Sequence, residues 1–233
     1  MVAQLIGVAF QAGRALLHGP WGIGKTTILL EVARNAREAG LSVGYCVRTR
    51  SLGDVVDALE HAYGTAGAAG LSAKQRKSVL RLAAERESGL LILDGLEAGG
   101  SALVGFMRSL RGKQLAVIAA ADVEHPRDLA AARASGVAYR ELAIPLLPVR
   151  ELSKFLEQLL QRQPLPCTLS GADRLALLNL AAGRPGVLER AWARLGQQRY
   201  WRGTFPLLET LRADIHLEWL AETSPVAVAG RPN

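Results

Sequence analysis

The sequence contains few of the residues that build covalent or metal-held scaffolds. Cys46 and Cys167 are its only cysteines in 233 residues, and its four histidines are scattered without metal-ligand spacing. Two thiols in a chain of this length indicate a reducing compartment. The sequence therefore predicts a cytoplasmic protein and gives no cysteine–histidine metal pattern.

Long apolar runs are also missing. The N-terminal stretch MVAQLIGVAFQAG has no basic residues ahead of its apolar part and is too short to cross a bilayer. No other run approaches membrane length. We therefore expect no membrane span, and we expect the N-terminal stretch to form a helix that packs on the core rather than a signal peptide.

The composition is that of a globular protein with a moderate excess of positive charge. Hydrophobic residues make up 49% of the chain and charged residues 21%, and Lys plus Arg number 28 against 21 Asp plus Glu, a formal charge of +7. This balance suits anionic partners such as nucleotides or nucleic acid. An ordinary cytosolic protein from an arginine-rich proteome would have the same balance.

Strand-like and helix-like segments alternate over the first part of the chain. The expected strands are 14–18, 41–47, 89–95, 114–120 and 138–144, and the expected helices are 25–39, 52–63, 72–87, 101–110 and 126–134. The run GLLILDG is apolar until its aspartate, which is typical of a central parallel strand buried on both faces. The fold class is therefore α/β, with a parallel sheet sandwiched by helices.

After Pro148 the alternation stops and only helices are expected. They span about 150–163, 170–182, 185–199 and 205–221, and a Pro/Gly-rich tail follows. The predicted domains are a core of residues 1–148, a small all-helical lid of residues 149–223, and a flexible tail of residues 224–233.

The stretch HGPWGIGKTT fits the phosphate-binding pattern GxxxxGKS/T between an expected strand and an expected helix. Glycines leave backbone N–H groups open to phosphate oxygens, and the helix start adds a positive dipole. Lys25 is expected to bridge the β- and γ-phosphates and Thr26 to place its hydroxyl on Mg²⁺. Trp21 either shields the loop or packs, and packing is favoured. The predicted nucleotide-contacting residues of the loop are Gly19, Pro20, Trp21, Gly22, Ile23, Gly24, Lys25, Thr26 and Thr27.

A phosphate-binding loop of this kind is also expected to have an acidic residue at the end of a neighbouring buried strand, and the run LLILDGLE supplies Asp94. Asp94 is expected to hold Mg²⁺ through water. Hydrolysis also needs a group that orients or deprotonates the attacking water. Gly95 has no side chain for this task, so Glu97 is the candidate catalytic carboxylate, its alternative being a solvated loop glutamate.

These motifs resemble those of the additional-strand ATPases, namely the AAA+ proteins and their signalling relatives, the STAND group. LLILDGLE is similar to the Asp-Gly-x-acid Walker B of NACHT-type members, with Glu97 as their second acid. ELAIPLLPVRELSKFL resembles the last core strand and the link to the first lid helix, and AAGRPGVLERAW resembles the Gly-x-Pro lid motif. The resemblance covers residues 14–200.

The resemblance implies further residue roles. Asp122 follows a strand in the place of sensor 1, although that place usually carries a neutral polar residue or an arginine. Gly183 and Pro185 match the lid motif that approaches adenosine, and Arg184 lies near the sensor 2 role. Arg133 and Arg140 are candidates for an arginine finger, or else ordinary surface arginines.

Basic residues crowd the third expected lid helix and its exit, among them Arg190, Arg194 and Arg199. Aromatic residues lie between them, which suits nucleic-acid phosphates and bases. The alternative is a solvated face whose aromatics pack on the lid.

Together the motifs predict a Mg²⁺-dependent ATPase that acts as a nucleotide-controlled switch or assembly factor, as a homo-oligomer or with a protein partner. ATP and ADP are expected rather than guanine nucleotides, because the Asn-Lys-x-Asp motif is missing. The alternatives are a DNA-associated AAA+ helper, a non-hydrolysing nucleotide-bound scaffold, and a small-molecule P-loop kinase, which would need a lid inserted within the core.

Overall fold

The computed structural model describes residues 1–47, 49, 51–65, 70–95, 101–124 and 140–223. The chain divides into two compact units, which we describe separately. The first unit comprises Met1–Pro20 and Lys25–Ile144, and the second comprises Trp21–Gly24 and the residues from Pro145 onward.

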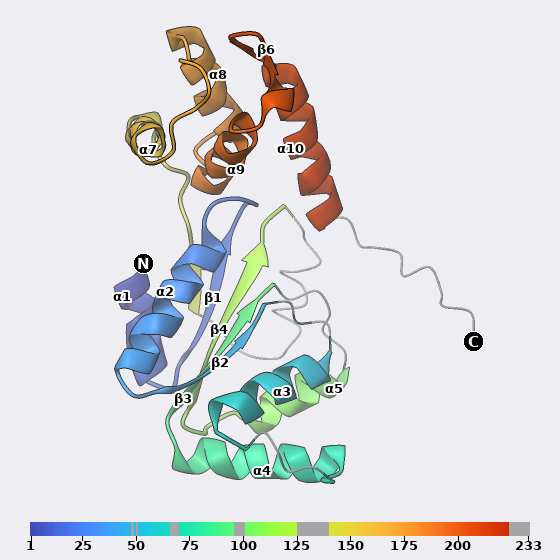
Figure 1. The fold of residues 1–233 in the computed structure, drawn as a ribbon. Coiled ribbons are helices and arrows are strands. Elements are labelled where there is room, and N and C mark those ends of the chain that lie inside the picture. Colours follow the sequence, from blue (N-terminus) through green and yellow to red (C-terminus); the bar gives the residue numbers. More distant parts are fainter. Residues whose placement is uncertain (48, 50, 66–69, 96–100, 125–139, 224–233) are drawn as a thin grey trace, which may run out of the picture. The chain divides into compact units, whose positions relative to one another are not determined.

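The first unit contains the parallel sheet that the sequence predicts. Its strands are β1 (Arg14–Gly19), β2 (Ser42–Cys46), β3 (Gly89–Asp94), β4 (Leu115–Asp122) and β5 (Arg140–Ala143). They lie in the order β2-β3-β4-β1-β5, and every pair is parallel (Figure 1). The predicted α/β fold is confirmed.

Helices cover the sheet because its central strands are apolar on both faces. The helices are α1 (Val2–Phe10), α2 (Lys25–Glu38), α3 (Leu52–Ala62), α4 (Ala73–Arg86) and α5 (Ser101–Ser109). On β3, Leu90 and Ile92 join a core with residues of α1 and α2, whereas Leu91 and Leu93 join a core with residues of α3, α4 and α5. Successive side chains of a strand alternate between faces, so the unbroken apolar run supplies both cores.

Local signals place the helix starts. Ser72 and Gln75 form the predicted capping box of α4, in which each side chain accepts a hydrogen bond from the other residue's backbone N–H. Ser51 and Asp54 form a similar box at the start of α3. Such caps satisfy N–H groups that have no partner within the helix.

The main difference within the sheet is the length of β4. It continues to Asp122 rather than ending near residue 120, because its pairing with β1 runs on until Asp122 lies opposite Gly19. The predicted helix 126–134 and the start of the strand predicted at 138–144 lie outside the described residues.

The second unit is mainly helical, as predicted. Its helices are α7 (Val149–Arg162), α8 (Gly171–Ala181), α9 (Pro185–Leu195) and α10 (Leu208–Thr223). They enclose an apolar core of their own, whose fully buried members include Leu152, Leu177, Leu188, Trp192 and Leu211.

The helix predicted over 185–199 is shorter in the structure. α9 ends at Leu195, before Gly196, and the buried Trp201 indole N–H donates to the Leu195 carbonyl at 2.6 Å. That bond satisfies a carbonyl which the helix end leaves without a partner. A short 3₁₀ turn and a hairpin of β6 (Trp201–Arg202) and β7 (Phe205–Pro206) then lead to α10.

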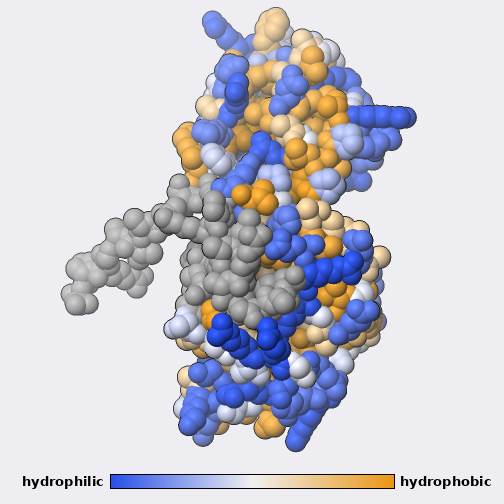
Figure 2. Space-filling model, turned by 180° about the vertical axis from the view of Figure 1, so that it is seen from behind, coloured by the Kyte–Doolittle hydropathy of each residue, from blue (hydrophilic) through white to orange (hydrophobic). Residues whose placement is uncertain are grey.

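The face drawn in Figure 2 carries hydrophilic residues interspersed with hydrophobic ones. Single exposed apolar side chains are ordinary on protein surfaces. Among the helices that the structure describes, none combines the length and apolarity that a membrane crossing requires.

Candidate functional site

Three strands of the first unit end beside one another and bring the predicted site residues together. Gly19 ends β1 and lies opposite Asp122, which ends β4, while Asp94 ends β3 and lies opposite Ala120. In open parallel sheets, ligands bind outside the carboxyl ends of the strands. The strand order β3-β4-β1 therefore collects a loop glycine and two carboxylates at one edge.

Lys25 begins α2, and its ammonium group turns back toward the end of β1. Its Nζ donates hydrogen bonds to the carbonyl oxygens of Gly19 at 2.7 Å and Pro20 at 3.0 Å, and lies 3.6 Å from Asp122 Oδ2. Burial lowers the pKa of Lys25, and the Asp122 carboxylate opposes that shift. The arrangement holds a cation between the loop and the strand end.

The loop backbone has the conformation that its glycines permit. Gly22 and Gly24 have φ of +76° and +102°, a region that other L-residues rarely adopt. A Cβ at Gly24 would meet nothing within 4 Å, so the backbone there is open to an approaching group. The helix α2 that follows has no acidic residue in its first turn, so its N-terminus retains the positive dipole that favours an anion.

Asp94 lies beside two hydroxyl side chains. The Tyr45 hydroxyl donates a hydrogen bond to Asp94 Oδ2 at 2.9 Å, and the Thr26 hydroxyl is close enough to favour the ionised carboxylate. Burial raises the pKa of Asp94, while the Thr26 and Tyr45 hydroxyls and the nearby Lys25 oppose the rise. The pKa of Tyr45 is also raised, first by burial and then by Asp94. A hydroxyl beside a carboxylate is the oxygen donor set that Mg²⁺ prefers, so these residues fit the predicted metal.

Asp122, an acidic residue that the family resemblance assigns to sensor 1, is almost fully buried. Its Oδ1 accepts a hydrogen bond from the Glu124 N–H at 2.9 Å, which leaves Oδ2 facing Lys25. The structure thus places the carboxylate against the lysine that the sequence assigns to phosphate.

Two predicted residues, Glu97 and Arg133, lie outside the described residues, and their roles stay predictions. Gly95 has φ of +91°, and its carbonyl accepts the Thr49 N–H at 2.9 Å, so it ends the strand without adding a side chain. Arg140 is exposed on β5.

Trp21 is packed within the second unit, as the sequence favours. Its side chain is buried, its indole N–H donates to Glu222 Oε2 at 2.7 Å, and the Arg190 guanidinium lies 4.4 Å from the centre of its ring. Both the face and the N–H of the indole are engaged, so the packing interpretation accounts for this side chain.

The lid motif forms a tight turn before α9. Gly183 has φ of +80°, and its carbonyl accepts the Leu147 N–H at 2.9 Å. Arg184 is the N-cap residue of α9, and its Nε donates to the Ala181 carbonyl at 3.3 Å, while Pro185 is the first helical residue. The Gly186 N–H donates to the Gly22 carbonyl at 2.8 Å, so the second unit joins its loop segment to the start of α9.

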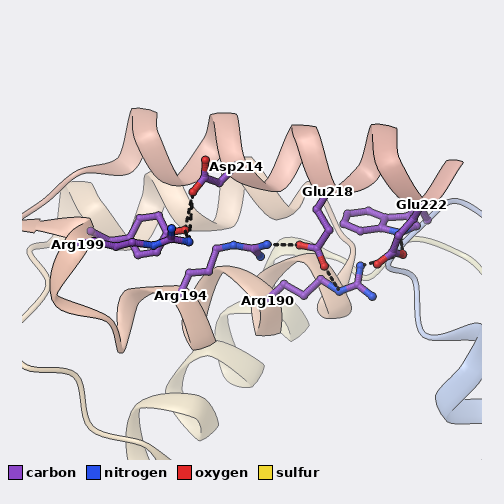
Figure 3. Close-up of polar contacts among 8 residues, drawn as sticks. Arg190, Arg194, Arg199, Asp214, Glu218 and Glu222 are labelled. Atoms are coloured by element: carbon purple, nitrogen blue, oxygen red, sulfur yellow. Dashed lines mark hydrogen bonds and ion pairs between the residues drawn. The ribbon is translucent and has the colours of Figure 1, made fainter. Parts of the chain in front are cut away.

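The three arginines predicted to meet nucleic acid are paired with carboxylates of α10 (Figure 3). Arg190 lies 3.6 Å from Glu218 and 3.4 Å from Glu222, Arg194 donates to Glu218, and Arg199 lies 3.6 Å from Asp214. The pairs balance three positive with three negative charges, so these three arginines do not by themselves make the face strongly basic. Their observed role is to join α9 and its exit to α10.

Sequence reasoning did not identify Tyr45 as part of the site. Tyr45 lies on β2, far from Asp94 in the sequence, and it reaches Asp94 only because β2 pairs with β3. No local sequence motif indicates that β2 pairs with β3. The nearest signal is a single aromatic hydroxyl in the strand SVGYC.

Solved structures match almost the whole chain. The Aeropyrum pernix ORC1 protein in complex with DNA is 21% identical with a TM-score of 0.62, and the match covers 97% of this chain and 68% of that one. The Aeropyrum pernix ORC2 protein in its ADP form is 19% identical with a TM-score of 0.57, covering 97% and 70%. AMPPCP-bound DnaA from Aquifex aeolicus is 17% identical with a TM-score of 0.52, covering 100% and 72%.

No protein-family model and no curated protein matches the sequence. At the identities of the solved structures, the likeness concerns the fold. The chain has the parallel-sheet P-loop fold of the AAA+ ATPases, with a helical C-terminal region. The narrower resemblance to the STAND group stays a prediction.

Proposed function

We propose that the chain is a regulatory ATPase of the AAA+/STAND type, which binds ATP or ADP with Mg²⁺ and acts as a nucleotide-controlled switch or assembly factor. The observation that carries the proposal is the convergence of Lys25, Thr26 and Asp94 at the N-terminus of α2. The similarity to the ADP form of ORC2 and to AMPPCP-bound DnaA supports it.

Each of these residues has a task that its contacts permit. Lys25 would turn its ammonium group from the Gly19 and Pro20 carbonyls toward the phosphates. Thr26 and Asp94 would hold Mg²⁺, which neutralises charge on the phosphates when bound. The open backbone of the loop would supply N–H donors to the phosphate oxygens.

Hydrolysis requires a further carboxylate, and we assign this role to Glu97. It follows Asp94 by three residues, and Gly95 offers no side chain. The alternative is a nucleotide-bound scaffold without turnover. The buried Asp122 beside Lys25 favours that alternative, because its negative charge opposes the γ-phosphate.

A DNA-associated helper ATPase is the second candidate. The similarity to ORC1 in complex with DNA and the formal charge of +7 favour it. The ion pairs of Arg190, Arg194 and Arg199 argue against these three arginines as the DNA contact. The two free cysteines support a cytoplasmic location for either function.

Replacement of Lys25 tests nucleotide binding. We expect Lys25→Ala to lose measurable binding of a fluorescent ATP analogue, because the only ammonium group that approaches the loop carbonyls in the described structure is removed. The matched control is Lys154→Ala, whose side chain is 57% exposed and pairs with Glu151 on α7. Undiminished binding by Lys25→Ala would refute the proposed function.

Replacement of Glu97 separates the ATPase from the scaffold. We expect Glu97→Gln to bind ATP as tightly as the unmodified chain and to lose phosphate release. Turnover that survives this change would make Glu97 a loop residue. Native mass and ATPase rate, measured with and without duplex DNA, then distinguish the regulatory switch from the DNA helper, since only the helper should respond to DNA in a salt-dependent way.

A further inference from the structure

Tyr45 makes a contact that the proposed function does not use. Its hydroxyl donates a hydrogen bond to Asp94 Oδ2 at 2.9 Å, across the boundary between β2 and β3. The ring is partly buried and packs on the core under α1 and α2. A hydroxyl in this apolar setting is directed at a single acceptor, and that acceptor is the carboxylate assigned to the metal.

The register of the sheet explains how Tyr45 reaches this carboxylate. Tyr45 lies opposite Ile92 on β3. Asp94 follows Ile92 by two residues, so the two side chains leave the same face of the sheet, where α2 packs. Long side chains reach such diagonal neighbours. The contact therefore follows from strand pairing rather than from a flexible loop.

We propose that Tyr45 is a positioning residue of the metal site, whose hydroxyl holds the Asp94 carboxylate in the orientation in which Asp94 and Thr26 together take Mg²⁺. The inference rests on the proposed function, because it requires a nucleotide-bound Mg²⁺ at these residues. The Tyr45 hydroxyl donates to the carboxylate from β2, and the Thr26 hydroxyl lies near it on α2, so the bond from Tyr45 restricts the rotation of Asp94 beside Thr26.

Groups that orient a metal ligand usually change metal affinity by about 10- to 100-fold when they are removed. Tyr45 has the features of such a group, because it touches the ligand and not the nucleotide loop. Its removal should leave the contacts of Lys25 with the loop intact. The expected effect is therefore a selective loss of the Mg²⁺-dependent part of nucleotide binding.

The test is Tyr45→Phe, which removes only the hydroxyl. Binding of a fluorescent ADP analogue is measured in EDTA and over a graded series of Mg²⁺ concentrations, together with the melting temperature. We expect unchanged affinity in EDTA and a Mg²⁺ midpoint raised about tenfold. The matched control is Tyr63→Phe, because the Tyr63 hydroxyl is buried and has no hydrogen-bond partner among the described residues. That control should keep the Mg²⁺ midpoint of the unmodified chain.

The outcomes separate the inference from the proposed function. An unchanged Mg²⁺ midpoint for Tyr45→Phe overturns the inference and leaves nucleotide binding standing. An equal loss of affinity in EDTA and in Mg²⁺ overturns it too, because that pattern belongs to a residue that only supports the fold. If the unmodified chain binds nucleotide without any response to Mg²⁺, the metal site fails and binding stands. If it binds no nucleotide at all, the proposed function fails and the inference fails with it.

Discussion

Asp122→Asn tests how the buried carboxylate beside Lys25 affects nucleotide binding. Asp122 is almost fully buried, and its Oδ2 lies 3.6 Å from Lys25 Nζ. A bound phosphate would compete with Asp122 for this ammonium group and would also meet its negative charge. Asparagine keeps the size of the side chain and an oxygen that can accept the Glu124 N–H. The substitution therefore removes the charge while preserving the shape.

The magnitude follows from the distances. A phosphate oxygen on the far side of Lys25 would lie about 6 Å from Asp122, and two unit charges at that separation repel by about 3 kcal/mol at an effective dielectric constant of about 20. Solvent near the strand ends screens part of this repulsion. We therefore expect Asp122→Asn to bind ATP about 10- to 100-fold more tightly.

The assay is titration with a fluorescent ATP analogue at saturating Mg²⁺. Burial lowers the pKa of Lys25, and the Asp122 carboxylate opposes this shift, so the pKa falls further in Asp122→Asn. The titration is therefore run near pH 6.5, about four units below the ordinary lysine value, to keep Lys25 protonated. Asp57→Asn serves as the control, because Asp57 is 69% exposed and pairs with Arg76 on the surface. Equal or weaker binding by Asp122→Asn would refute the reasoning, since it would mean that phosphate and Asp122 do not compete.

Three further predictions concern stability and reactivity. Gly183→Ala should lower the free energy of unfolding by about 2–4 kcal/mol, because Gly183 has φ of +80° and the new Cβ would lie 2.9 Å from Leu146 Cβ. In the control Gly105→Ala the new Cβ on α5 meets nothing within 4 Å, so the free energy of unfolding should rise by about 0.5–1 kcal/mol. Urea unfolding measures both changes. A thiol reagent near pH 8, about the ordinary range of a cysteine, should modify Cys167 quickly and Cys46 only after denaturation, because burial covers Cys46 and raises its pKa to about 12; fast modification of both thiols would contradict this. Burial also raises the pKa of Tyr63 to about 12, so the unfolded chain releases the Tyr63 and Cys46 protons first, and the melting temperature should fall as the pH rises from 9 toward 12; a flat profile would contradict the burial of both groups.

The glycine-rich turn and the aspartate at the end of β3 could be predicted because each is a local pattern. Glycines and a lysine at fixed spacing specify the turn before α2, and an apolar run that ends in an aspartate specifies β3. The position of Asp122 was predicted less well. The sequence places the end of its strand two residues earlier, because alanines carry little strand preference and only pairing with β1 extends β4.

Charge patterns in the sequence left two interpretations of the lid arginines open. Arg190, Arg194 and Arg199 are close in sequence and indicate a basic surface. Their carboxylate partners come from α10, beyond a hairpin, and a sequence does not state which helices pack together. A count of charges along one helix therefore gives the net charge of that surface only when the helix that packs against it is known.

By itself the sequence determined the kinds of elements, the P-loop, and Asp94 as the acid at the end of a buried strand, because these depend on residue spacing along one segment. Tertiary structure decided what each charged or polar side chain touches: Asp122 faces Lys25, Tyr45 holds Asp94, and α10 neutralises the lid arginines. The physical reason is that strand order, strand register and helix packing bring together segments that are distant in the chain. They therefore decide which groups come within the short distances at which hydrogen bonds and ion pairs form.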